Sequence, residues 1–137
     1  MNDRYLYRAK RTDNEEWVEG YYVFCRRRHY ILPICGKCGF DEREDYWTEV
    51  APSTICQCTG LKDKNGKLIW ENDILVGYLD DMYKENATYA QVIWDKNGFY
   101  TKEKDSDDIS LMDEFDEKYF EVCGNIFDNM EMLEVGE

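Results

Sequence analysis

The sequence contains a single histidine, His29, among its 137 residues. Catalytic dyads of two histidines and most zinc-hydrolase ligand sets need more than one, so these arrangements are excluded. The glycine-rich dinucleotide fingerprint, the Walker phosphate loop and the Gly-x-Ser-x-Gly nucleophile motif are also absent. The enzymatic arrangement left open is a nucleophile pair of Cys25 with His29. We therefore expect a protein that binds other molecules without catalysing a reaction and that carries no cofactor.

The sequence also lacks long apolar runs. No stretch reaches the length of about 20 apolar residues that a membrane-spanning helix needs. Residues 1–5 lack the charged-then-apolar layout of a signal peptide. We therefore expect a cytoplasmic protein that makes no membrane contact, in which most of the six cysteines are reduced.

Basic residues are scarce and unevenly placed. The chain has 17 lysines and arginines against 30 aspartates and glutamates, which gives a net charge of −13. Residues 103–137 account for most of this imbalance, with 2 basic and 13 acidic side chains. A concentrated acidic region repels nucleic acid and attracts basic surfaces, although it can also be only a solvated face. Direct nucleic-acid binding is therefore not expected.

Strand-like composition recurs along the chain, at residues 5–10, 17–24, 29–32, 73–79 and 120–127. The tetrapeptide Asp63-Lys64-Asn65-Gly66 and its copy Asp95-Lys96-Asn97-Gly98 lie between strand-like segments. Because Asn-Gly readily takes the positive φ values of a tight turn, both copies predict β-hairpins. Residues 35–46 are rich in glycine and charge and predict an excursion loop.

One helix is predicted. Ser110 with Asp113 resembles a capping box, and the apolar side of the helix is formed by Leu111, Met112, Phe115 and Tyr119. Asp128 and Asn129 predict a closing turn through Leu133. The expected class is mainly β, with short antiparallel strands and one short helix in a small barrel or a pair of curled sheets. We place an N-terminal β subdomain at residues 1–58 and a C-terminal one at residues 59–137.

Three segments resemble the YopX-like family of phage proteins. Residues 54–74 read TICQCTGLKDKNGKLIWENDI and are similar to the signature segment of that family. Residues 17–23 (WVEGYYV) resemble its N-terminal strand, and residues 120–129 (FEVCGNIFDN) resemble its C-terminal strand. The order and spacing of the three segments fit as well. Cys58 departs from the pattern where an aromatic residue is usual, and Met130 departs where a proline is common.

The resemblance implies a setting and a fold. Proteins of this kind are encoded in phages and prophages, mostly of Gram-positive bacteria, which places this chain in the cytoplasm of a bacterial host. It implies a β-rich fold whose C-terminal part is a small SH3-like barrel. It implies no catalytic residues.

Cys35-Gly36-Lys37-Cys38-Gly39 has the form of a zinc knuckle, in which a tight turn aims two thiolates at one metal ion. Cys35 and Cys38 would need two further ligands, either Cys56 with Cys58 or Cys25 with His29. The Cys56-x-Cys58 spacing is too tight for a second knuckle of the same type. We therefore prefer cysteines that are buried or in loops, and expect no metal.

Arg26, Arg27 and Arg28 form a basic cluster in an otherwise acidic chain. They could contact a phosphate backbone or pair with the acidic C-terminal region, and the charge imbalance favours the second interpretation. We expect a homo-oligomer in which they face acidic residues of another copy, with Asp113, Glu114, Asp116 and Glu117 as candidates. A host or phage protein is a further possible partner. The alternative is an inhibitor whose carboxylates imitate DNA and occupy a host nucleic-acid-binding protein.

Overall fold

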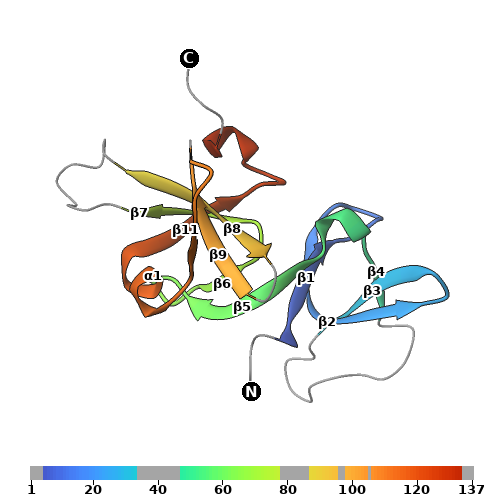
Figure 1. Cartoon of the computed structure of the whole chain (residues 1–137). Coiled ribbons are helices and arrows are strands. Elements are labelled where there is room, and N and C mark those ends of the chain that lie inside the picture. The colour runs from blue at the N-terminus through green and yellow to red at the C-terminus, as the bar shows by residue number, and fades with distance from the viewer. Residues whose placement is uncertain (1–4, 34–46, 78–86, 96–97, 105, 134–137) are drawn as a thin grey trace. The chain divides into compact units, whose positions relative to one another are not determined.

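The computed structural model describes residues 5–33, 47–77, 87–95, 98–104 and 106–133. These residues form two compact units, Met1–Cys58 (unit 1) and Thr59–Glu137 (unit 2). Antiparallel strands dominate both units, and the single α-helix of the described residues is short, which confirms the mainly β class (Figure 1). Among the described residues, no helix has the length and apolar character needed to cross a membrane.

The strands of unit 1 belong to a six-stranded antiparallel sheet in the order β4-β3-β2-β1-β5-β6, whose last strand, β6 (Leu68–Trp70), is part of unit 2. The elements of unit 1 are β1 (Tyr7–Lys10), β2 (Trp17–Cys25), β3 (Arg28–Pro33), β4 (Thr48–Glu49), the 3₁₀ helix η3 (Pro52–Thr54) and the start of β5 (Cys56–Lys62). The predicted strands of this unit are confirmed, and β4 was not predicted. Ala9, Ile31 and Val50 form the buried core of the unit.

Unit 2 contains a five-stranded antiparallel sheet in the order β10-β9-β8-β7-β11 (Figure 1). Its elements are the end of β5, β6 (Leu68–Trp70), β7 (Asp73–Gly77), β8 (Thr88–Asp95), β9 (Gly98–Glu103), β10 (Ile109–Leu111), α1 (Glu114–Tyr119), β11 (Phe120–Asn125) and the 3₁₀ helix η5 (Met130–Leu133). The buried core is formed by Ile69, Leu75, Ala90, Val92, Met112 and Phe120. The closing turn through Leu133 is confirmed as η5, whereas closure of the sheet into an SH3-like barrel stays a prediction.

The first predicted hairpin is confirmed, with a different turn geometry. The backbone N–H of Gly66 donates to the carbonyl oxygen of Asp63 at 2.9 Å, and that of Asp63 donates to Lys67 at 2.7 Å. Gly66 has a φ of +84°, whereas the φ of Asn65 is not positive. The turn therefore places only the glycine in the left-handed region, as in a type I turn closed by a glycine bulge.

The second copy of the tetrapeptide also joins two paired strands. Asp95 and Gly98 are partners at the end of the β8–β9 ladder. Lys96 and Asn97 lie outside the described residues.

The predicted start of the helix was wrong. Ser110 is paired with Thr101 in the β9–β10 ladder, and α1 begins at Glu114. Asp113 precedes the first helical residue, and its backbone N–H donates to Oδ2 of Asp116 at 2.8 Å. Ser110 and Leu111 therefore pair in a strand and do not form the first turn of the helix. The side chain of Asp116, the third residue of the helix, caps its N-terminus instead. Leu111 accordingly belongs to a strand and is exposed, rather than lying on an apolar helix face.

Candidate functional site

A hollow of about 490 Å³ lies on the core-facing side of the unit 2 sheet. Strands β8, β9 and β10, the segment before α1, α1 itself and the start of β11 all contribute to it. Its lining residues are Thr88, Thr101, Glu103, Ser110, Leu111, Asp113, Asp116, Tyr119 and Phe120. We call it the inner hollow.

The strand register explains why hydroxyl groups meet in the inner hollow. Thr101 lies directly opposite Val92 on β8 and Ser110 on β10. Residues directly opposite one another share a face of the sheet, and Val92 is part of the buried core. Glu103 follows Thr101 by two positions, so it lies on the same face at the end of β9.

Hydroxyl groups line the inner hollow. Thr101 is 6% exposed and lines the hollow. Nearby, the hydroxyl of Tyr119 donates to Oγ1 of Thr88 at 3.5 Å. The hydroxyl groups of Thr101, Thr88 and Tyr119 thus all lie along the hollow.

The charged groups of the inner hollow are carboxylates. Glu103 and Asp113 are exposed, while Asp116 is 7% exposed and accepts the hydrogen bond from the Asp113 backbone. Burial raises the pKa of Asp116 above its ordinary value, and the negative charge of Asp113 adds to the shift against the opposing backbone hydrogen bond. The hollow therefore has a negative potential and one carboxyl group that is easier to protonate than usual.

The raised pKa of Asp116 predicts a pH-dependent effect of the Asp116→Asn substitution. The folded state binds a proton that the unfolded state releases between the ordinary and the raised pKa of this carboxyl group, so Asp116 lowers stability as the pH rises through that window. Asparagine stays neutral and can still accept the Asp113 N–H. We expect the stability of D116N relative to the wild type to increase with pH across the window. Urea unfolding between pH 3.5 and 7 measures this, and parallel pH profiles would contradict it.

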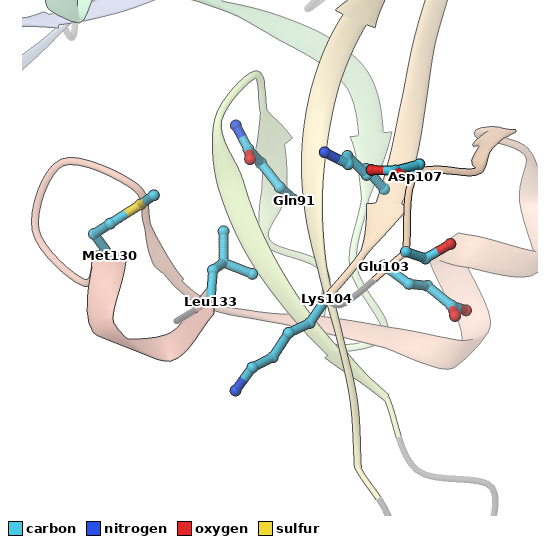
Figure 2. Close-up of a pocket in the computed structure, with 8 residues that line it drawn as sticks. Gln91, Glu103, Lys104, Asp107, Met130 and Leu133 are labelled. Atoms are coloured by element: carbon cyan, nitrogen blue, oxygen red, sulfur yellow. The ribbon is translucent and has the colours of Figure 1, made fainter. Parts of the chain in front are cut away.

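A smaller hollow of about 280 Å³ lies on the opposite face of the same sheet. Figure 2 shows Met130 and Leu133 of η5 on one side of it and Gln91, Lys104 and Glu103 around the other. Lys102 also lines it, opposite Gln91 in the ladder. The side-chain amide of Gln91 donates to Oδ1 of Asn72 at 3.2 Å, so this polar group is already engaged. With both lysines and carboxylates around it, this hollow has no clear charge preference.

The arginine cluster lies at the tip of the β2–β3 hairpin in unit 1. Cys25 and Arg28 are paired at the end of the ladder, and Arg26 and Arg27 form the two-residue turn between them. Their φ values are +53° and +65°. All three arginines are exposed, and Nη1 of Arg28 lies 3.4 Å from Oε1 of Glu49. Arg26 and Arg27 therefore project from the turn, while Arg28 contacts a carboxylate of its own unit.

An aromatic group accompanies these arginines. Phe24 is 60% exposed, and its ring centroid lies 5.0 Å from that of His29. The His29 ring is stacked on Tyr22, and a hydrogen bond of 2.5 Å joins the Tyr22 hydroxyl to Nδ1 of His29. Because His29 pairs with Phe24, Cys25 points to the opposite face of the hairpin. The register thus does not bring Cys25 and His29 together as a nucleophile pair.

The four acidic candidates differ in their surroundings. Asp113 and Glu114 are exposed at the start of α1, whereas Asp116 is buried. Oε1 of Glu117 accepts the backbone N–H of Lys62 at 3.1 Å. Two of the four carboxylates therefore stabilise the fold through backbone hydrogen bonds, so this segment gives no support to DNA mimicry, which needs carboxylates directed at a partner.

The cysteine candidates are only partly described. Cys35 and Cys38 lie outside the described residues. Cys56 and Cys58 are both fully buried in β5, and Sγ of Cys56 donates to the carbonyl oxygen of Thr54 at 3.3 Å. Within the described ranges, no group of three or more histidine, cysteine, aspartate or glutamate side chains could hold a metal ion.

Sequence patterns missed the inner hollow. Thr101 has no motif around it, and its role depends on its pairing with both Val92 and Ser110. The spacing of two positions between Thr101 and Glu103 was the one available signal. In a strand this spacing places both side chains on one face, but it does not identify the residues that this face contacts.

Comparison with known proteins identifies the family. The family model of the YopX protein matches residues 6–134. The chain belongs to the YopX family. This YopX-family protein is also similar to a solved structure, the crystal structure of protein EF1440 from Enterococcus faecalis, with a TM-score of 0.56 and 23% sequence identity. The match covers 93% of this chain and 96% of EF1440, and it supports the fold alone. No curated protein matches the sequence.

Proposed function

We propose that this YopX-family protein is a non-catalytic binding module that self-associates, in the cytoplasm of a bacterium that carries the phage or prophage encoding it. The proposal rests on the conformation of Arg26 and Arg27. Both residues occupy the left-handed region of backbone space, with φ of +53° and +65°. This is the geometry of a type I′ turn, in which asparagine and glycine are strongly preferred.

The strain of this turn suggests a role for its side chains. A left-handed conformation costs a residue with a Cβ atom about 1–2 kcal/mol, and arginine lacks the short polar side chain with which asparagine offsets the cost. The chain therefore has two arginines where asparagine and glycine would be more stable. Strain of this kind is found where the residues have a function. Their exposure at a hairpin tip beside Phe24 suits an anionic protein surface, because arginine and aromatic residues are enriched at interface hot spots.

Charge complementarity favours a second copy of the chain as the partner. The segment 103–137 carries 13 acidic and 2 basic residues, whereas the net charge of −13 repels nucleic acid at long range. The arginine tip belongs to unit 1 and the acidic segment to unit 2, so the contact is between two different surfaces. Such a heterologous contact closes into a ring or extends into a filament, depending on the rotation between copies.

Substitution of the turn tests this proposal, since it separates stability from association. We expect R26N/R27G to raise the free energy of unfolding by about 1–2 kcal/mol, because the turn loses its strain. We also expect the variant to be monomeric, while the wild type forms multimers that dissociate in 1 M salt, where the Debye length is about 3 Å. Light scattering at 50 mM and 1 M salt, together with urea unfolding, measures both effects.

Two variants control this experiment. R26K/R27K keeps both the charge and the strain, so it should keep most of the association. R11N removes a cation elsewhere in unit 1, where Arg11 pairs with Asp13 at 2.7 Å, and should leave the size distribution unchanged. A wild type that is monomeric at 50 mM salt, or an R26N/R27G variant that still forms multimers, would contradict self-association through this tip.

A further inference from the structure

We propose that β10 of one copy receives the arginine tip of another copy, through antiparallel strand pairing between β10 and the end of β2. This inference rests on the proposed self-association and names the surface of the receiving copy. Two exposed strand edges carry it, one in each unit, together with the charges beside them. The addition of a strand to an exposed sheet edge is a recurring way for one chain to bind another.

The first edge belongs to β10, which ends the unit 2 sheet on one side. Just beyond the β9–β10 ladder, the N–H of Met112 donates to the carbonyl oxygen of Phe99 at 3.0 Å. Hydrogen-bonded pairs alternate along an antiparallel ladder, so the next residue of β10 that bonds β9 is Ser110. The backbone N–H and C=O groups of Ile109 and Leu111 therefore point away from β9, where no described strand pairs with β10.

The side chains of this edge suit a further strand. Ile109 and Leu111 are 37% and 62% exposed. Leu111 lies directly opposite Tyr100 on β9, which in turn lies opposite Ile93 on β8. Residues directly opposite one another share a face, so an apolar row crosses these strands and ends at the exposed Leu111. A strand added to β10 would continue this row.

The second edge lies at the end of β2, beside the arginine tip. Among the described residues, β1 pairs with β2 only up to Gly20, whereas β2 continues to Cys25. The carbonyl oxygen of His29 accepts the N–H of Val50 at 3.0 Å, on the side of β3 that faces away from β2. Phe24, the partner of His29, therefore points its own N–H and C=O away from β3. It has no described strand neighbour on that side.

The two edges fit together in one antiparallel register. If Ile109 of one copy pairs with Phe24 of another, each residue can donate its N–H to the other, and two exposed apolar side chains share a face. Two positions outward from this pair on each strand, Arg26 lies opposite Asp107. Both side chains are exposed, and Asp108 adds a second exposed carboxylate next to them.

Charge favours this pairing over the pairing of two β10 strands. Two aspartates precede β10, and Asp113 and Glu114 follow it. Two β10 strands side by side would bring these carboxylates together, which is one way in which proteins keep identical edges apart. The end of β2 is instead followed by three arginines. Because the two edges differ, each copy offers one of each, and the contact can repeat from copy to copy.

Ile109→Pro blocks the receiving edge and leaves the β9–β10 ladder intact. Proline has no N–H, and the N–H of residue 109 is not used in the ladder, so the first position of this edge strand can accept it. We expect I109P to unfold near the wild-type urea concentration. We also expect it to need at least about tenfold more protein for half-maximal association, because the contact loses a hydrogen bond. Ile109→Val keeps the N–H and is the matched control, and light scattering at low salt measures both.

Two acidic residues test the register. Asp107→Asn removes the carboxylate opposite Arg26 and should weaken association about fivefold, the upper range for an exposed ion pair. Glu114→Gln removes a carboxylate beyond the other end of β10 and should leave association unchanged. Both residues are exposed, so this comparison holds even if I109P is destabilised. Equal association of D107N and E114Q would overturn the pairing.

Mixing two blocked variants separates this inference from the proposed function. R26N/R27G keeps its β10 and I109P keeps its arginine tip, so each should be monomeric alone and the two should form a heterodimer when mixed. A monomeric wild type, or an R26N/R27G variant that still associates, would overturn the proposed function and this inference with it. A monomeric R26N/R27G beside an I109P that associates like the wild type would overturn only the role of β10, and so would a mixture that stays monomeric.

Discussion

Asp63→Ala is expected to lower the free energy of unfolding of unit 2 by about 3–5 kcal/mol, since it removes three hydrogen bonds to a buried carboxylate. Oδ1 of Asp63 accepts the backbone N–H groups of Asn65 and Lys67, each at 2.9 Å. Oδ2 accepts the N–H of Val122 on β11, also at 2.9 Å. Asp63 is 5% exposed, so alanine would leave these donors without a partner where water has little access. Urea unfolding, followed by circular dichroism and tryptophan fluorescence, measures the loss.

The second copy of the turn tetrapeptide provides the control for Asp63. Asp95 begins the same four residues, but among the described residues it accepts no bond corresponding to the one from Val122. Asp95→Ala should therefore cost less than about 1 kcal/mol, in the range of an exposed turn position. Asp63→Asn should be intermediate, because its amide nitrogen cannot accept a hydrogen bond. Equal losses in D63A and D95A would show that the link to β11 adds nothing.

Gly20→Ala is expected to destabilise unit 1 by about 3 kcal/mol, the upper range for overpacking a close-fitting site. A Cβ atom at position 20 would overlap the carbonyl oxygen of Leu32 and lie 2.8 Å from its carbonyl carbon. Both atoms belong to the backbone of β3, so neither can move aside without separating the β2–β3 ladder. Thermal unfolding and hydrogen exchange at the backbone amides of β2 and β3 measure the effect.

Gly98→Ala is the matched control for this steric argument. A Cβ atom at position 98 has its nearest neighbours at 3.4 Å and 3.8 Å, both of them side-chain atoms. This substitution should change stability by less than about 1 kcal/mol. If G20A proves as stable as G98A, the approach of β3 to Gly20 is not a constraint on the fold.

The strands could be predicted from the sequence because strand composition and turn residues depend on only a few neighbouring positions. The Asn-Gly hairpin at 63–66 was predicted for that reason, and the glycine takes the positive φ on which the prediction depended. The start of the helix at Ser110 was missed because the capping pattern is equally local, while the pairing of Ser110 with Thr101 involves a different strand. A competing tertiary contact decided the outcome there.

The candidate sites were predicted unevenly for a related reason. The cluster of Arg26, Arg27 and Arg28 is contiguous in sequence, so its charge was visible. Its strained turn was hidden, since neither residue is one that normally marks a type I′ turn. The inner hollow brings together groups from β8, β9, β10, α1 and β11, and only the register of the sheet shows that they share a face.

The bond between Asp63 and Val122 has a consequence for the order of folding. It joins residues 59 positions apart, and β7 likewise pairs with β11 across a long stretch of chain. The first hairpin of unit 2 can form early. Oδ2 of Asp63, however, cannot accept the N–H of Val122 until residue 122 has been synthesised. High contact order of this kind slows folding, because a long loop must close before the contact stabilises anything. During synthesis, β7 would therefore remain an open strand edge until β11 arrives to cover it.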